Sequence, residues 1–148
     1  MKKSLSSTQK AYLAGFLDGD GSIYVRLKPN STYRYGFQVA PYIVLFQSQK
    51  DQKNFERIGQ LIGLGHIRIR NDGILEYIIS RNESIRIFLK LVMPYLVLKR
   101  KQADVMLRIL NQKERVRNAS DFQSLANLID QFRELNYSKK RKKRALTL

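Results

Sequence analysis

Two aspartates stand two residues apart between glycines in the segment Asp18-Gly-Asp-Gly21, and they are the only acidic residues among the first fifty. Carboxylate oxygens bind divalent cations, and the lysines and arginines around this segment would attract a phosphate backbone. Metal-assisted attack on a phosphodiester needs both kinds of group. The pair is therefore a candidate metal site for phosphodiester chemistry.

The basic surroundings extend over the whole chain of 148 residues, which has a formal net charge of +16 and a pI near 10.3. Six of these charges belong to the run Lys139–Arg144 and ten remain on the rest. A field of this sign favours a polyanion such as DNA, RNA or an acidic membrane surface.

Other function classes are disfavoured by what the chain lacks. It contains no cysteine, which excludes disulfides, thiolate zinc sites and a cysteine nucleophile. It has no apolar run near the roughly 18 residues of a membrane-spanning helix, and its first residues lack the apolar core of a signal peptide. We expect a soluble, intracellular protein with no membrane partner.

The aspartates follow a segment, residues 6–17, that is predicted to form a helix ending at Asp18-Gly-Asp-Gly. Ser6 with Gln9 three residues later fits a capping box. Small residues recur at four-residue spacing, which places them in one stripe along a helix. A second backbone could approach this stripe closely; its members are Ala11, Gly15 and Gly19.

Strict alternation predicts a half-buried strand over residues 22–28, followed by a turn at 29–32. A longer strand is predicted over residues 36–48, where Pro41 suggests a sheet edge or a bulge. The core-facing positions of the two strands are predicted to be Ile23, Val25, Leu27, Phe37, Val39, Ile43 and Leu45.

The remaining segments continue the same plan. A helix capped by Asp51 is predicted to stop at Gly63, and two strands, 67–70 and 75–80, flank an Asn71-Asp-Gly turn. Helices are then expected over residues 83–92, 102–112 and 121–135. The order indicates an α+β fold with an antiparallel sheet, as one domain over residues 1–137 with a basic tail over 138–148.

The segment Leu13-Ala-Gly-Phe-Leu-Asp-Gly-Asp-Gly21 is nearly the LAGLIDADG signature, and the chain resembles the homing endonuclease family that carries it. It is most similar to the single-motif class found in algal chloroplast ribosomal-RNA introns. The resemblance implies a fold of order αββαββα with a curved antiparallel DNA-binding sheet and extra C-terminal helices. Further landmarks in order are Lys28-Pro-Asn, Ser48-Gln-Lys-Asp, Gly63-Leu-Gly-His-Ile, Pro94-Tyr-Leu and Lys99-Arg-Lys-Gln-Ala.

The resemblance also implies an activity: a site-specific, staggered double-strand break in a long, nearly palindromic DNA target. One motif per chain implies a homodimer, because two strands must be cut. Asp20 and the carbonyl of Gly19 would bind Mg²⁺, for which Mn²⁺ or Ca²⁺ could substitute in binding. The implied dimer interface is Ala11, Tyr12, Ala14, Gly15 and Asp18, although capping of the helix end is the interpretation that we favour for Asp18.

Three more catalytic residues are implied by the family motifs. Gln49 matches the glutamine that orders water, with Gln47 as a rival because the strand before it seems to carry a short insertion. Lys99 matches a lysine suited to stabilising phosphate charge. Lys53 falls where similar enzymes place an arginine. The alternative for each is a solvated surface side chain.

DNA readout is expected from alternate strand positions and from the turn between the first two strands. Arginine and glutamine suit guanine and adenine edges, whereas alanine and valine can only touch thymine methyl groups. The tail is expected to bind phosphates, with a disordered tail or a nuclear-import signal as alternatives. The expected DNA-binding residues are Ser22, Tyr24, Arg26, Lys28, Asn30, Tyr33, Arg34, Gln38, Ala40, Tyr42, Val44, Arg68, Arg70, Glu76, Ser138, Lys139 and Lys142.

Two other functions remain open at this point: an intron RNA maturase, or a DNA-binding protein of the same fold that does not cleave. A basic RNA- or ribosome-binding structural protein would explain the charge but not the acidic pair. Chloroplast, mitochondrion and prokaryotic cytoplasm are all compatible locations.

Overall fold

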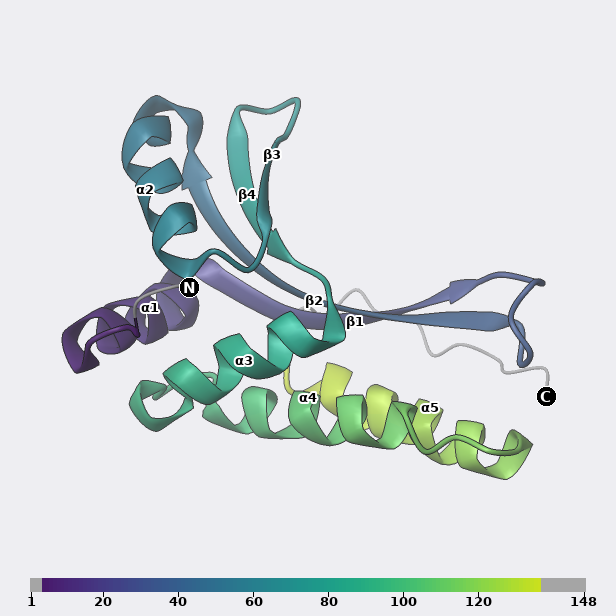
Figure 1. Ribbon diagram of the computed structural model, residues 1–148. Helices are drawn as coiled ribbons and strands as arrows, with labels where there is room; N and C mark the ends of the chain where they lie inside the picture. Colours follow the sequence, from purple (N-terminus) through teal and green to yellow (C-terminus); the bar gives the residue numbers. More distant parts are fainter. Residues whose placement is uncertain (1–3, 137–148) are drawn as a thin grey trace.

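A computed structural model describes residues 4–136 and confirms the α+β order αββαββα followed by two extra helices (Figure 1). Short 3₁₀ turns, η1 (Gln49–Asp51) and η2 (Met93–Tyr95), precede α2 and α4. The elements are α1 (Ser7–Asp20), β1 (Gly21–Pro29), β2 (Phe37–Ser48), α2 (Gln52–Ile62), β3 (His66–Ile69), β4 (Ile74–Ile79), α3 (Asn82–Val92), α4 (Arg100–Lys113) and α5 (Ala119–Glu134).

The four strands form one antiparallel sheet in the order β1-β2-β4-β3. The sheet curves, and the β1–β2 hairpin extends far beyond the shorter β3–β4 hairpin (Figure 1). Helices α3, α4 and α5 lie together on one side of it. Within residues 4–136 no helix covers the opposite face, which leaves a long concave surface open.

Pro41 lies at an edge of the sheet, as its residue type predicts. It pairs with Val25 of β1, but β2 does not begin to pair with β4 until Ile43. The β1–β2 register runs unbroken from Gly21↔Leu45 to Pro29↔Phe37, so there is no bulge.

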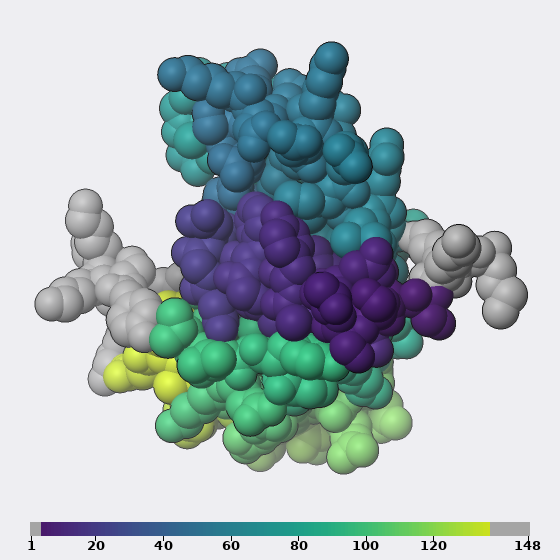
Figure 2. Space-filling model, turned by 90° about the vertical axis from the view of Figure 1, so that its left-hand side faces the viewer, coloured from purple at the N-terminus to yellow at the C-terminus, as the bar shows by residue number. Residues whose placement is uncertain are grey.

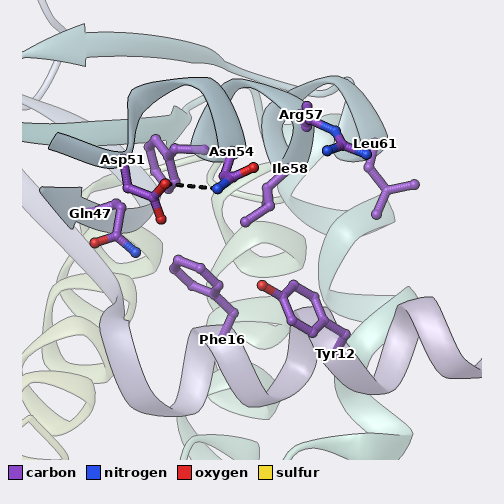
Figure 3. A pocket seen from close by; sticks show the side chains of 9 residues that line it. Tyr12, Phe16, Gln47, Asp51, Asn54, Arg57, Ile58 and Leu61 are labelled. Carbon is purple, nitrogen blue, oxygen red and sulfur yellow. Dashed lines mark hydrogen bonds between the residues drawn. The ribbon is translucent and has the colours of Figure 1, made fainter. Parts of the chain in front are cut away.

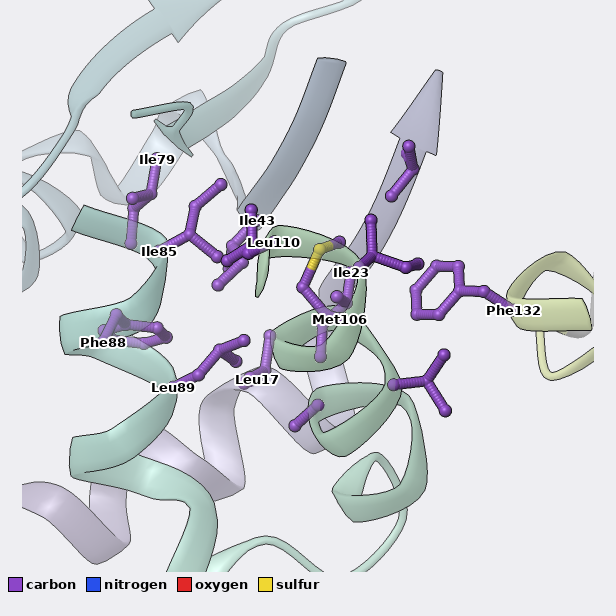
Figure 4. Packing of buried hydrophobic residues seen from close by; sticks show 14 of the residues in the cluster. Leu17, Ile23, Ile43, Ile79, Ile85, Phe88, Leu89, Met106, Leu110 and Phe132 are labelled. Atoms are coloured by element: carbon purple, nitrogen blue, oxygen red, sulfur yellow. The ribbon is translucent and has the colours of Figure 1, made fainter. Parts of the chain in front are cut away.

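The core lies between the sheet and the helices (Figure 4). The predicted inward positions of β1 and β2 are all buried except Phe37, which is half-buried. Helix α5 contributes Phe122, Leu125, Leu128, Ile129 and Phe132, all of them buried as predicted. Alternation in the strands and 3.6-residue spacing in the helices therefore place the open face of the sheet opposite the core.

Helix α1 runs one turn further than predicted, because neither of the glycines after Asp18 adopts a left-handed conformation. The helix continues to Asp20, and Gly21 is extended, with φ −126°. A Cβ at Gly21 would lie 2.7–2.9 Å from atoms of Leu17, so glycine is required there by close approach. In contrast, α2 stops at Gly63 as predicted, and this glycine adopts the left-handed conformation, with φ 64°.

None of the helices described in residues 4–136 has the length and apolar character that crossing a bilayer requires.

Candidate active site and nucleic-acid interface

The carboxylate of Asp18 attaches the end of α1 to the loop before α4. One oxygen accepts hydrogen bonds from the backbone N–H groups of Val97 (2.8 Å) and Leu98 (3.1 Å), and the other accepts from the N–H of Lys99 (2.9 Å). Asp18 therefore has an intrachain structural role. Its assignment to the dimer interface stays a prediction.

The same contact positions Lys99. Its ammonium donates a 2.8 Å hydrogen bond to the backbone carbonyl of Asp18, two residues before Asp20. The last carbonyls of a helix lack intrahelical partners and carry the negative end of its dipole. A cation is thus fixed beside the end of α1, and the structure brings together two residues that lie 81 positions apart in the sequence.

Asp20 and Gly19 are exposed at this helix end. Within the described residues the side chain of Asp20 has no hydrogen-bond or ion-pair partner, and no three acidic or histidine side chains cluster as a complete metal-binding set. One free carboxylate and the adjacent backbone carbonyls are hard oxygen donors. This set fits a hydrated Mg²⁺, which commonly takes only one or two protein carboxylates.

The two candidate glutamines point to different places. Gln47 lies two residues beyond Leu45, the partner of Gly21, and lines the groove beside α1. Gln49 lies beyond the end of the strand, at the start of η1. Its Oε1 is 3.9 Å from where a Cβ on Gly73 would be, against the β3–β4 turn. The geometry therefore favours Gln47 over Gln49, because β2 continues without an insertion.

A groove of about 510 Å³ separates α1 from α2 (Figure 3). Tyr12 and Phe16 form its floor on α1, while Asn54, Ile58 and Leu61 line it on α2. Arg57 also lines the groove, a cation that sequence analysis missed, although its spacing from Asn54 on an amphipathic helix offered a signal. Lys53 is exposed on α2 and has no partner within residues 4–136. Asp51 begins α2 as expected, but its side chain accepts from the amide of Asn54 (2.8 Å) rather than from the backbone.

The predicted small-residue stripe of α1 lies open on the surface (Figure 2). Ala11 and Gly15 are exposed, and a Cβ at Gly15 or Gly19 would meet nothing within 4 Å. Ala14 is the exception among the predicted interface residues. Ala14 is next to Gly15 in the sequence but faces the core, and it is 0% exposed. Its assignment to the interface was therefore wrong.

Two exposed apolar residues, Val97 and Leu98, adjoin the stripe. Their side chains are 80% and 66% exposed, although their backbone N–H groups are held by Asp18. Sequence analysis missed them because the run Tyr95-Leu-Val-Leu resembles core sequence. Their exposure beside an open helix indicates a surface that another macromolecule covers.

The middle of the open sheet face is occupied by two tyrosines. Tyr24 and Tyr42 are directly opposite in register, and their rings stack with centroids 5.1 Å apart. Burial raises the pKa of Tyr24, so it remains a neutral phenol at physiological pH. Ala40 and Val44 lie on the same face but are only 7% and 1% exposed. Their assignment as DNA-contacting residues stays a prediction, and their low exposure leaves little side-chain surface for such a contact.

The remaining predicted contact residues surround this pair. Arg68 is 3.5 Å from Glu76, and Arg70 is 2.7 Å from Asp72. At the hairpin tip Asn30 accepts hydrogen bonds from Thr32, and Tyr33 and Arg34 are exposed. On the strands, Arg26 is exposed, and half-buried positions are held by Ser22, Lys28 and Gln38. Ser138, Lys139 and Lys142 lie outside the described residues.

This combination of an antiparallel saddle, a motif helix with an open stripe and a terminal carboxylate defines a class of protein. The sequence profile of the LAGLIDADG endonuclease family matches residues 13–109, and the chain belongs to this family.

Two relatives are similar along most of their lengths. The DNA endonuclease I-CreI of Chlamydomonas reinhardtii is 38% identical over 135 residues, covering 88% of this chain and 80% of the relative. The DNA endonuclease I-CvuI of Chlorella vulgaris is 34% identical over 131 residues, covering 88% and 81%.

Solved structures agree with the fold. I-CvuI crystallised with the I-CreI target DNA in the presence of magnesium, uncleaved, superposes with a TM-score of 0.86 at 32% identity, over 91% of this chain and 86% of that one. The complex of I-CvuI with its own target in the presence of calcium gives 0.85. The archaeal intron-encoded endonuclease I-Vdi141I bound to DNA gives 0.81 at 19% identity, which supports the fold alone.

Proposed function

We propose that this protein is a site-specific DNA endonuclease that makes a staggered double-strand break as a homodimer, each subunit cutting one strand. The observation that carries the proposal is the end of α1, where the exposed carboxylate of Asp20 lies two residues beyond the Asp18 carbonyl that accepts a hydrogen bond from the Lys99 ammonium. The names of the two relatives and their DNA complexes support the same activity.

In this mechanism Asp20 and the carbonyl of Gly19 would hold Mg²⁺. When bound, the ion supplies an activated water and charge stabilisation at the scissile phosphate. Lys99 offers its remaining N–H donors to a phosphate oxygen as negative charge develops there. Gln47, on the wall of the groove beside α1, is the proposed water-ordering residue in place of Gln49.

The dimer would form through the stripe of α1, because glycines on a helix allow two backbones to approach closely. The groove lies along one side of α1, beside Tyr12 and Phe16. Val97 and Leu98 lie near the C-terminal end of the same helix. A two-fold axis across α1 would place Leu98 of each subunit toward the groove of the other, burying the exposed apolar side chains. The open sheet face of each subunit would then bind one half of a palindromic target in the major groove.

The test is to incubate the full chain with a library of randomised palindromic duplexes and to sequence the cleaved and the bound molecules separately. Cleavage is expected with Mg²⁺ or Mn²⁺ and not with a chelator. Binding should persist with Ca²⁺. Asp20→Asn should abolish cutting while binding survives, and normal cleavage by this variant would contradict the assigned site.

The same assay separates the alternatives. Binding without cleavage under any of these ions would indicate a DNA-binding protein without nuclease activity. Stimulation of splicing when precursor RNA replaces the duplex would indicate a maturase, and this function can coexist with cleavage.

A further inference from the structure

The open sheet face carries one lysine whose position is fixed by other side chains. The ammonium of Lys28 donates a 2.9 Å hydrogen bond to the hydroxyl of Tyr42 and lies 5.5 Å from the centre of that ring. Tyr42 in turn stacks on Tyr24. A lysine side chain is normally a flexible stem, whereas this one is hydrogen-bonded to the hydroxyl of a ring that is itself held by stacking.

The sheet register locates this ammonium. Lys28 pairs with Gln38, Tyr42 pairs with Tyr24, and the Arg26↔Ala40 pair lies between them. The side chains of Lys28 and Tyr42 therefore lean toward each other across this middle pair. Ala40 is almost fully covered, with 7% of its surface exposed. The cation therefore stands over Ala40, above the middle of the face rather than at its rim.

A cation in this place suits a base edge. One of the three N–H donors of Lys28 is used by Tyr42, which leaves two for a partner. Guanine presents two adjacent acceptors, O6 and N7, in the major groove, whereas adenine pairs its N7 with an amino donor and cytosine presents an amino donor alone. Two free donors at a fixed point thus match the two acceptors of guanine better than the single O4 acceptor of thymine, and they oppose the amino donors of adenine and cytosine.

We propose that Tyr42 is a positioning residue for specificity: it holds the Lys28 ammonium over Ala40 so that each subunit requires guanine at one position of its half-site. The inference rests on the proposed binding of duplex DNA by this face, and it names the residue pair that sets one base preference. Lys28 makes the contact with the base, and Tyr42 acts only through Lys28.

The experiment selects bound duplexes from the randomised palindromic library with Ca²⁺ present, so that the result does not depend on cleavage. Wild-type chain is expected to prefer guanine over adenine at one symmetric position by about tenfold or more. Lys28→Met should abolish that preference. Tyr42→Phe, which keeps the ring stack and removes only the hydroxyl, should reduce it at least about threefold at the same position.

Tyr95→Phe is the matched control, because Tyr95 is an exposed tyrosine in η2, outside the sheet, and its hydroxyl has no partner among residues 4–136. It should leave the guanine position unchanged. Circular dichroism of each variant verifies that the fold is intact.

Two results would overturn the inference. If Tyr42→Phe keeps the full guanine preference that Lys28→Met removes, then Tyr42 does not position the lysine. If both variants weaken binding to all sequences equally, Lys28 contacts a phosphate instead of a base. Selective binding without cleavage would leave the inference standing and contradict only the proposed nuclease activity, whereas no binding to duplex DNA would contradict both.

Discussion

Replacing Asp18 by asparagine should destabilise the fold, whereas the same replacement at Asp20 should not. The Asp18 carboxylate accepts three backbone N–H groups, two on one oxygen and one on the other. An asparagine keeps a single acceptor oxygen, and its NH₂ group would face at least one N–H donor. Asp20 has no partner to lose within the described residues, and it stands at the negative end of the α1 dipole.

The structure sets the size of each effect. Hydrogen bonds to a charged group contribute about 1.5–3 kcal/mol each, and Asp18→Asn removes one or two of them. The summed range is about 1.5–6 kcal/mol, and we expect a loss of about 2–4 kcal/mol, below the upper end of that range because the site is partly exposed. In a domain of this size this corresponds to a fall of roughly 6–12 °C in Tm. Neutralising Asp20 should change stability by less than about 1 kcal/mol, in the stabilising direction.

The assay is thermal and urea unfolding of both variants and the wild type at one protein concentration, since dimerisation makes Tm depend on concentration. Cleavage is measured on the same samples below the lowest Tm. A Tm for Asp18→Asn within about 2 °C of wild type would refute the structural role of Asp18. An equally large fall for Asp20→Asn would refute the assignment of Asp20 as a free carboxylate.

Other predictions concern the dimer, the glutamines and a buried lysine. Gly15→Glu or Leu98→Asp should shift the protein from dimer to monomer in sedimentation equilibrium, and an unchanged dimer would rule out the α1 interface. Gln47→Ala should slow cleavage by about a hundredfold while Gln49→Ala changes it little; single-turnover rates with the opposite order would restore Gln49 as the site residue. Burial lowers the pKa of Lys113, so its protonation in the folded state costs stability at pH values below that lowered pKa. Lys113→Met should therefore raise Tm at neutral pH by less than about 4 °C, and the gain should vanish as the pH rises to the ordinary lysine range; a constant gain would contradict this origin.

Periodicity predicted the elements well, because alternation and helical spacing follow directly from backbone geometry. The inward positions of β1 and the apolar face of α5 were all identified. The end of α1 was placed too early because glycine was taken as a stop signal. At Gly21 the glycine instead serves a close approach to Leu17, a tertiary contact that no local pattern reports.

The sequence predicted which residues form the candidate site but not which of them contact one another. Asp20 and Lys99 came from motifs, yet only the fold places the loop at residues 97–99 against α1. The choice between the two glutamines stays a prediction, because the motif match points to Gln49 whereas the position beside the α1 groove favours Gln47. Ala40 and Val44 were expected to touch DNA since alternation gives the face of a side chain, but it does not tell whether neighbouring side chains cover it.

The contact between Asp18 and the loop before α4 also determines when, during translation, the site becomes complete. The carboxylate is made early, but its three N–H partners and the ammonium of Lys99 lie 79–81 residues later in the chain. A nascent chain that has completed α1 and the sheet still lacks the cation beside Asp20. A ribosome-bound fragment shorter than about two thirds of the chain would therefore contain Asp20 but not the Lys99 ammonium. Cutting competence would arise only late in translation.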